Sequence, residues 1–300
     1  MNTCQTETLK IQCSKPGLLD KLSAYWTLTK GKQSFLLLIT GWAGFSSAKC
    51  PVTGWEMMLG MLGSLFLAIC GSTVLNMVVD SDIDVKMART SKRPLATGVV
   101  SLREGLGLGL ILSLVGIGWA FTLSSLYGWI VLGGLLIDVV VYSIMLKRRT
   151  PYSILWGGVS GGMPILAGRA LGLGSIDLIG VLLALAILLW IPTHIMTFSM
   201  KYAEDYRNAG IPTFPSVYGE KTTRLVLAWS TALAGIDMMI AAYLLGMQGY
   251  YLVALAVLGI ALIGFAAVSV VRPSAKLNFR LFKAASTYML GAMLLIALAI

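Results

Sequence analysis

Three polar residues spaced four apart, Asn76, Asp80 and Asp84, lie where a long apolar stretch of the chain gives way to a polar one. Residues four apart share one face of an α-helix, so a helix that continues here would stack the three side chains one turn apart, at roughly 6 Å of rise. Two carboxylates at that spacing can each hold a hard divalent cation whose remaining ligands are water and phosphate oxygens. The spacing therefore predicts a Mg²⁺ site for a phosphorylated substrate.

Basic side chains follow these carboxylates directly, at Arg89, Lys92 and Arg93. Arginine presents a planar fork of donors that matches phosphate oxygens, so this segment is suited to an anionic substrate. We expect Asp82 to point away from the polar column and to support it from the loop. The alternative interpretation is a solvated helix end whose acids and bases merely neutralise one another.

A second group of acidic and basic residues follows a later apolar stretch. Its candidate site residues are His194, which is the one histidine of the chain, and Lys201, Tyr202, Glu204, Asp205 and Arg207. If the two groups face each other, with basic residues between their carboxylates, they form a site for a Mg²⁺-bound diphosphate. Apolar helices behind such a site would suit an isoprenoid tail. On its charge pattern alone, the second group is also compatible with an ordinary loop at a membrane surface.

The composition places these groups in a membrane protein. Of the 300 residues, 57% are hydrophobic and 12% are charged, and the mean hydropathy is +0.83. Soluble proteins are about half apolar and about one-quarter charged. A soluble enzyme, a disordered chain and a secreted module held by disulfides are therefore excluded. We expect a single membrane domain over residues 1–300 that begins with a polar cytoplasmic segment over residues 1–32.

Apolar runs predict an all-α fold, a bundle of nine transmembrane helices, because a helix needs roughly 20 mostly apolar residues to cross a bilayer. The expected helices lie near residues 33–48, 54–79, 104–122, 126–146, 153–173, 178–200, 225–246, 249–271 and 284–300. The first run is short and is broken by glycine. Glycine is frequent inside the runs, as expected where membrane helices pack closely.

The basic residues give the chain an orientation. With nine helices, the connections on one face hold 21 of the 23 Lys and Arg residues, whereas the other face holds only Lys49 and Arg169. Cytoplasmic loops carry the excess of Lys and Arg in membrane proteins. We therefore predict that the amino terminus and both polar groups lie on the cytoplasmic side. Membrane lipid is an expected partner, and nucleic acid is not.

The amino-terminal segment also bears on the compartment. Its first 32 residues are polar and lack arginine, so they resemble neither a cleavable signal peptide nor a mitochondrial transit peptide. We expect the plasma membrane of a bacterium or an archaeon. Cys4, Cys13, Cys50 and Cys70 have no metal-site spacing and no haem-attachment motif, and we expect them to be unpaired thiols.

At its two polar groups the chain resembles the intramembrane prenyltransferase superfamily of the UbiA type, whose first motif reads Asn-x-x-x-Asp-x-x-x-Asp. Within that superfamily it is most similar to the protohaem IX farnesyltransferases, or haem O synthases. The similar stretches run from Asn76 to Gly98 (NMVVDSDIDVKMARTSKRPLATG), from Tyr142 to Gly168 (YSIMLKRRTPYSILWGGVSGGMPILAG) and from Pro192 to Gly219 (PTHIMTFSMKYAEDYRNAGIPTFPSVYG).

The resemblance implies Mg²⁺-dependent transfer of a farnesyl group from farnesyl diphosphate to a vinyl side chain of protohaem, which gives haem O. It implies that Asp80, Asp84 and Asp205 hold the Mg²⁺ with Glu204 beside them, and that Asn76 completes the catalytic set. The residues expected to bind the diphosphate or the haem are Arg89, Arg93, Lys147, Arg148, His194, Lys201, Tyr202 and Arg207. The resemblance also implies a contact with haem A synthase.

Other interpretations stay open at this point. The chain departs from the usual pattern of the branch at Met77 and Ile195, where an acceptor pocket could lie, so the acceptor could be a quinone precursor or a glycerol phosphate lipid. A cation-coupled transporter is a third hypothesis, and it predicts that the intramembrane carboxylates Asp138 and Asp237 matter most. The basic run 147–149 is also compatible with a plain positive-inside anchor.

Overall fold

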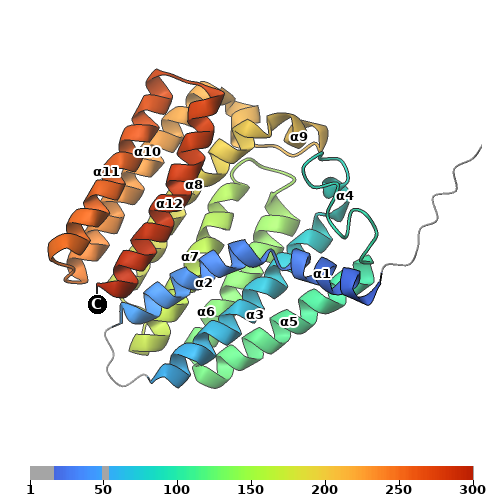
Figure 1. The fold of residues 1–300 in the computed structure, drawn as a ribbon, viewed down its shortest axis with the longest axis horizontal. Helices are drawn as coiled ribbons and strands as arrows, with labels where there is room; N and C mark the ends of the chain where they lie inside the picture. The colour runs from blue at the N-terminus through green and yellow to red at the C-terminus, as the bar shows by residue number, and fades with distance from the viewer. Residues whose placement is uncertain (1–16, 49–53, 300) are drawn as a thin grey trace, which may run out of the picture.

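The computed structural model describes residues 17–48 and 54–299, and every regular element in these ranges is a helix (Figure 1). The helices are α1 (Leu18–Leu28), α2 (Gly31–Ser46), α3 (Trp55–Val79), α4 (Ser81–Asp84), α5 (Leu102–Leu123), α6 (Ser125–Leu136), η1 (Ile137–Leu146), α7 (Ser153–Leu173), α8 (Leu178–Lys201), α9 (Ala203–Asn208), α10 (Phe214–Leu244), α11 (Gly249–Val271) and α12 (Ala275–Leu298). The prediction of an all-α fold is confirmed.

Each predicted apolar run corresponds to a helix or, for the fourth run, to α6 followed directly by η1. Seven segments are long and apolar enough to cross a membrane, namely α3, α5, α6 with η1, α8, α10, α11 and α12. Of the other two, α2 has only 16 residues, and α7 is rich in glycine and contains Arg169. The chain is therefore a multi-pass membrane protein, while the count of nine spans and the orientation stay predictions.

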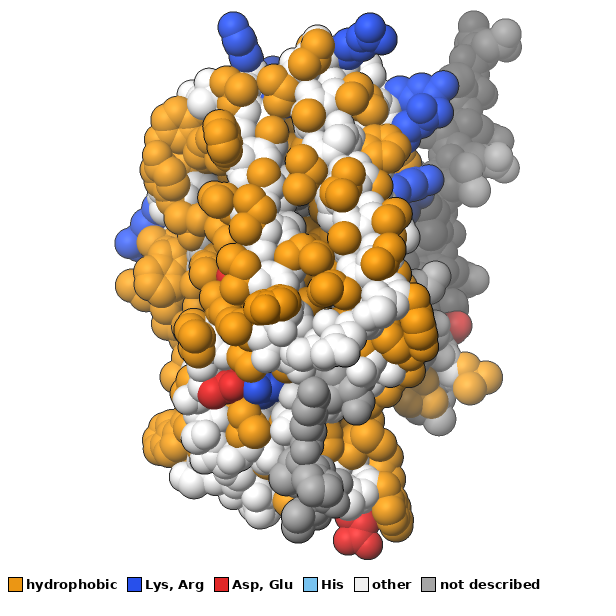
Figure 2. Space-filling model, turned by 90° about the vertical axis from the view of Figure 1, so that its left-hand side faces the viewer, with side chains coloured by type: hydrophobic (Ala, Val, Ile, Leu, Met, Phe, Trp, Pro, Cys, Tyr) orange, Lys and Arg blue, Asp and Glu red, His pale blue; other side chains and the backbone are white. Residues whose placement is uncertain are grey.

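The surface of the bundle carries large apolar side chains. Trp229 is 71% exposed, Ile260 is 70% exposed and Val271 is 77% exposed. Figure 2 shows hydrophobic side chains over most of one face, with most of the visible Lys and Arg side chains in its upper half. A continuous apolar surface of this kind marks contact with a membrane or a partner protein.

The bundle has two sides joined by a central pair of helices. Figure 1 shows α10, α11 and α12 along one side, α3, α5 and α6 along the other, and α2 and α7 between them. The central pair packs backbone against backbone, because a Cβ atom added at Gly44 would lie 2.1 Å from the carbonyl oxygen of Ile165. A Cβ atom at Gly168 would likewise lie 2.1 Å from the carbonyl oxygen of Gly41. Small residues permit such close approach in membrane bundles, which explains why α7 is rich in glycine.

The helix that carries the first polar group does not run on without a break. α3 ends at Val79, Asp80 adopts φ −89° and ψ 1°, and the short helix α4 continues to Asp84. The Asp84 N–H nevertheless donates to the Asp80 carbonyl oxygen at 2.9 Å, so the four-residue register is kept across the break.

Cys70 is buried in α3, and the prediction of unpaired thiols stays a prediction, because the other cysteines are not described. Cys4, Cys13 and Cys50 lie outside the described residues.

Candidate active site

A ladder of polar contacts joins α3 to η1 at one end of the bundle. The Ser72 hydroxyl and the Asn76 amide both donate to Asp138 Oδ2, at 2.5 Å and 2.6 Å. The Ser143 hydroxyl donates to Asn76 Oδ1 at 2.8 Å. The polar column of α3 therefore begins one turn earlier than predicted, at Ser72. It faces two polar residues of η1, Asp138 and Ser143.

The ladder ends in an ion pair between Asp80 and Lys147. Asp80 is 7% exposed, and Lys147 contacts only one of its two carboxylate oxygens. The other oxygen, Oδ1, is buried and has no hydrogen-bond partner among the described residues. Burial alone would lower the pKa of Lys147, but the neighbouring Tyr142 and Asp80 raise that pKa above its ordinary value, so the ammonium stays charged.

Asp84 is held by a second base. Arg93 donates to both of its carboxylate oxygens, at 2.8 Å and 2.7 Å, and Asp84 is only 3% exposed. A bidentate pair of this kind fixes the geometry of both partners. Because Thr90 also donates to the Asp84 carbonyl oxygen at 3.0 Å, the loop that follows α4 folds back over the carboxylate.

Asp82 lies on the outer side of this turn, away from Asp80 and Asp84. Arg148 donates to its two carboxylate oxygens at 2.9 Å and 2.7 Å, and to the Val79 carbonyl oxygen at the end of α3 at 2.7 Å. The hydrogen bonds from Arg148 to the carboxylate lower the pKa of Asp82 below its usual range. Arg148 thus caps the end of α3. It is connected to the site through this helix end and through Asp82.

The second polar group meets the first through Asp205 of α9. Its two carboxylate oxygens accept hydrogen bonds from the backbone N–H groups of Ala88 and Arg89, both at 3.3 Å. The Arg89 guanidinium lies over the rings of Phe198 and Tyr202, at 4.9 Å and 5.4 Å from their centroids. The two loops are therefore neighbours at the same end of the bundle, where Figure 1 places α4 beside α9.

The remaining residues of the second group lie further out. Lys201 sits over the Phe279 ring at 3.7 Å and over the Tyr202 ring at 5.0 Å. Glu204 and Arg207 are exposed. The structure pairs Asp80 and Asp84 each with a base and joins Asp205 to the backbone of the loop that follows α4, but it does not bring Glu204 or Arg207 into contact with these carboxylates.

The four predicted metal ligands do not form one compact group. Within the described part of the chain, no three or more His, Cys, Asp or Glu side chains gather closely enough to hold a metal ion. The reason is that each carboxylate is engaged separately, Asp80 by Lys147, Asp84 by Arg93 and Asp205 by backbone N–H groups. The buried, unpartnered Oδ1 of Asp80 is the atom that fits a divalent cation, since such an oxygen otherwise carries an uncompensated desolvation cost.

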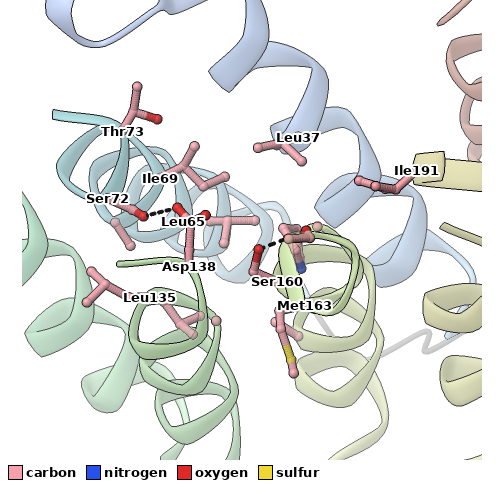
Figure 3. Close-up of a pocket in the computed structure, with 17 residues that line it drawn as sticks. Leu37, Leu65, Ile69, Ser72, Thr73, Leu135, Asp138, Ser160, Met163 and Ile191 are labelled. Carbon is pink, nitrogen blue, oxygen red and sulfur yellow. Dashed lines mark hydrogen bonds between the residues drawn. The ribbon is translucent and has the colours of Figure 1, made fainter. Parts of the chain in front are cut away.

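An apolar cavity of about 230 Å³ opens beside the ladder. Figure 3 shows Ser72 and Asp138 pointing toward each other at its edge, with Leu65, Ile69 and Met163 among the apolar residues that line it. Asp138 at the edge of this cavity bonds to Asn76, which lies one turn before Asp80, so polar contacts connect the apolar space to the Asp80 site. A substrate with a charged head and a hydrocarbon tail matches this arrangement.

A smaller cavity of about 90 Å³ is lined in part by Lys147. Tyr142, Lys147 and Tyr206 line it together with the start of α10. Lys147 thus borders a space shared by the two polar groups as well as contacting Asp80.

His194 lies in an aromatic stack between α8 and α12. Its ring is 4.9 Å from the Trp190 ring and 4.5 Å from the Phe282 ring, measured between centroids. Its Nδ1 atom is 3.2 Å from the Ser286 hydroxyl, and Nε2 bonds to no described residue. His194 lines neither of the two cavities above.

Four residues near the site are absent from the predicted set, namely Ser72, Asp138, Ser143 and Lys30. The sequence does indicate Ser72, because it precedes Asn76 by four residues in the same column. It indicates Asp138 only as an intramembrane carboxylate, like Asp237 of α10, which lines neither cavity. Lys30, between α1 and α2, adopts the left-handed conformation with φ 46°. Burial and the nearby charges of Arg93 and Lys147 lower its pKa to about 8.

Comparison with known proteins agrees with these features. The profile of the UbiA prenyltransferase family matches residues 37–293. A protohaem IX farnesyltransferase from Korarchaeum cryptofilum is 39% identical over 230 residues, which are 76% of this chain and 77% of that protein.

Two solved structures share the fold. A structure described as a study of digeranylgeranylglyceryl phosphate synthase has a TM-score of 0.77 at 22% identity and covers 93% of this chain and 98% of its own. A UbiA homologue from Archaeoglobus fulgidus bound to GPP and Mg²⁺ has a TM-score of 0.68 at 16% identity and covers 92% of this chain and 100% of its own. The chain belongs to the UbiA prenyltransferase family.

Proposed function

We propose that this protein transfers a farnesyl group from farnesyl diphosphate to a vinyl group of protohaem IX, giving haem O. The observation that carries the proposal is the series of polar contacts that connects the paired carboxylates Asp80 and Asp84, through Asn76, to Asp138 at the edge of an apolar cavity. The diphosphate would bind among the cations, and the farnesyl chain would fill the cavity. The identity to a protohaem IX farnesyltransferase supports haem as the acceptor.

The residues present fit a divalent cation. Asp80, with its unpartnered Oδ1, would hold Mg²⁺ with Asn76 beside it, and Asp84 and Asp205 would join the metal only by exchanging their present partners, Arg93 and the backbone N–H groups of the loop after α4. The cation would supply positive charge that stabilises the departing diphosphate. The UbiA homologue with bound Mg²⁺ supports this use of a metal. Glu204 is exposed, so we do not place it among the direct Mg²⁺ ligands.

Bases of this chain would bind the diphosphate. Lys147 and Arg93 border the carboxylates, and Arg89 is oriented by its two aromatic neighbours. Fixed positive charge placed where negative charge develops is an effective way to promote ionisation. Lys201 and Arg207 are exposed and would attract the anionic head from the outer side.

The allylic cation that forms when the C1–O bond breaks must meet the vinyl group before it meets water. The C–C bond that then forms leaves a cation on the former vinyl group, and one water molecule adds to it and releases a proton, which gives the hydroxyl group of the product. The apolar lining of the cavity, including Leu65, Ile69 and Met163, would exclude bulk water from the hydrocarbon chain. His194 and its aromatic neighbours on α8 and α12 are the proposed contact for the planar acceptor. Its free Nε2 would face that acceptor.

We further propose nine spans, a cytoplasmic amino terminus and a plasma-membrane location with the site on the cytoplasmic side. The uneven distribution of Lys and Arg supports this orientation. Arg169, one of two basic residues on the opposite face, does not oppose it, because it donates to both carboxylate oxygens of Asp177 at 2.7 Å. A contact with haem A synthase is part of the same proposal.

Two alternatives remain testable. A glycerol phosphate lipid or a quinone precursor would replace haem as acceptor without changing the diphosphate half of the site. A transporter would need Asp138 and Asp237 and could dispense with Asp80 and Asp205. Membership of a prenyltransferase family favours the enzyme.

An acceptor competition tests the proposal. The purified chain is incubated with Mg²⁺, labelled farnesyl diphosphate and an equimolar mixture of protohaem, a phenolic quinone precursor and a glycerol phosphate lipid. Label in a haem product alone is the expected result. Label in the phenol or the lipid would reject haem as the acceptor, and prenyl transfer to none of the three would reject the proposed function.

A further inference from the structure

The carboxylate of Asp138 contacts the amide of Asn76 across the interface between η1 and α3. Asn76 Nδ2 donates to Asp138 Oδ2 at 2.6 Å, and the Ser72 hydroxyl donates to the same oxygen at 2.5 Å. At the other end of the amide, Asn76 Oδ1 accepts from the Ser143 hydroxyl at 2.8 Å. Both ends of one amide are therefore held by one short helical segment.

We propose that Asp138 is a positioning residue that, together with Ser143, fixes the amide of Asn76 with its oxygen on the side of Asp80, available to a divalent cation. The inference rests on the proposed function, because it assigns Asn76 to the Mg²⁺ site. It goes beyond that function by giving a role to an intramembrane carboxylate outside the Asn-x-x-x-Asp-x-x-x-Asp column.

Donor and acceptor chemistry decides the orientation of the amide. A carboxylate oxygen only accepts hydrogen bonds, so only the NH₂ end of Asn76 can face Asp138 Oδ2. Since the residues on η1 run in the order Asp138, Ser143, Lys147, and Lys147 pairs with Asp80, the oxygen end lies toward Asp80. A carbonyl oxygen has two lone pairs, and the Ser143 hydroxyl uses one of them. The second is free for a cation.

The π-helical form of η1 makes this double contact possible. Asp138 and Ser143 are five residues apart, and in an α-helix such residues would be separated by about 140° around the axis. η1 is a π-helix, whose N–H to C=O bonds span five residues, as in the 2.8 Å bond from the Lys147 N–H to the Tyr142 carbonyl oxygen. The wider turn brings both side chains to Asn76, while α3 presents its polar residues every four positions. π-helical turns occur frequently at functional sites.

A packing role would not require a carboxylate at this position. Asp138 lines the apolar cavity, where an ionisable group is costly and tends to be functional. An apolar residue of similar size would fill the same space without hydrogen bonds. Groups that orient metal ligands typically affect metal affinity by about 10–100-fold when they are removed.

The test measures binding of Mn²⁺ to the full-length protein in the presence of inorganic diphosphate, by electron paramagnetic resonance. D138L removes the acceptor at similar size, whereas D138N removes the charge but keeps a carbonyl oxygen that can accept from Ser72 and Asn76. We expect D138L to weaken Mn²⁺ binding by about 10–100-fold, and D138N to change it by less than about threefold. Equal weakening in D138N and D138L would overturn the proposal, because the charge and not the position of the amide would then matter.

A double-mutant comparison shows whether the effect passes through Asn76. If it does, N76A and N76A/D138L bind Mn²⁺ equally weakly. Losses that add in the double variant would contradict the proposal. S143A provides a second route if D138L does not fold, and it should also weaken Mn²⁺ binding; unchanged binding in S143A would count against the double contact.

A matched control lies in the same cavity. Ser160 lines that cavity but donates only to the Gly157 carbonyl oxygen, at 2.9 Å, so S160A should leave Mn²⁺ binding unchanged. An effect of S160A equal to that of S143A would show that any change in the cavity disturbs the metal, which rejects a specific role for the amide contacts. The assay contains neither farnesyl diphosphate nor haem. A negative result would therefore reject the role of Asp138 alone. The proposed function is tested separately, by the acceptor competition.

Discussion

Lys147 binds one carboxylate oxygen of Asp80 and leaves the other, Oδ1, buried and without a partner among the described residues. Buried polar atoms are almost always hydrogen-bonded, so such an oxygen needs an explanation. It lies one turn from Asn76, whose amide bonds to Asp138 at the edge of an apolar cavity, and a divalent cation bound to Oδ1 would explain it. The ion pair holds the carboxylate in place, and the free oxygen gives the site its capacity to bind Mg²⁺.

This ion pair makes a prediction for stability. K147M leaves the carboxylate of Asp80 buried without a counter-charge, which typically costs about 3–5 kcal/mol. R148M breaks an exposed pair with Asp82, which is usually worth about 0–1 kcal/mol. Thermal unfolding in one detergent should therefore show a much larger loss for K147M than for R148M. Equal losses would mean that Asp80 does not depend on Lys147.

The cavity makes a prediction for substrate length. A Cβ atom added at Gly157 would lie 3.5 Å from the Tyr142 ring, an ordinary contact, so a side chain can begin here, and the methyl groups of G157V should narrow the cavity that Gly157 lines. We expect KM for farnesyl diphosphate to rise by about tenfold or more, and KM for the shorter geranyl diphosphate to rise less.

G133V is the matched control for that variant. A Cβ atom at Gly133 meets nothing within 4 Å, and this residue does not line the cavity. Both KM values should stay unchanged in G133V. If G157V affected the two substrates equally, the farnesyl chain would have to lie elsewhere.

The position of Lys30 makes a prediction for pH. Its pKa in the folded protein is lowered to about 8 from 10.5, chiefly by burial and then by the charges of Arg93 and Lys147. Between these two pKa values the unfolded chain binds more protons at this residue, so the free energy of unfolding should rise as the pH rises from 8 toward 10.5. Thermal unfolding over this range should show the gain in the wild type and a smaller gain in K30M. The same gain in both proteins would show that Lys30 is not buried beside the cations.

The aromatic stack makes a prediction for the acceptor. H194F keeps a ring between Trp190 and Phe282 but removes both ring nitrogens. If His194 contacts the haem, H194F should raise KM for protohaem and leave KM for farnesyl diphosphate unchanged. Steady-state kinetics with each substrate varied in turn provides the measurement, and unchanged values for both substrates would assign His194 to packing alone.

Much of the fold follows from local patterns in the chain. The apolar runs predict each long helix to within a few residues for α3, α7, α8 and α11, because burial in a bilayer imposes a length and a composition on every span. The four-residue spacing of Asn76, Asp80 and Asp84 likewise predicts their shared register.

Other features depend on residues that are distant in sequence. The Asn76–Asp138 contact joins positions 62 residues apart, and nothing in the local pattern of either helix encodes the π-helical turn that permits it. The ion pair of Asp80 with Lys147 likewise joins positions 67 residues apart. Glu204 was predicted beside the metal because it neighbours Asp205 in sequence, but adjacent residues of a helix point in different directions.

The most direct test of the central claim is product formation by D80A and by D82A. Each purified protein is given farnesyl diphosphate, protohaem and Mg²⁺, and hydroxyfarnesylated haem is measured by mass spectrometry, with EDTA as the metal-free reference. We predict Mg²⁺-dependent product in the wild type, a loss of at least about 100-fold in D80A, and near-normal product in D82A, whose carboxylate pairs with Arg148 at the surface. Full product formation by D80A would contradict the assignment of Asp80 to the metal-diphosphate site.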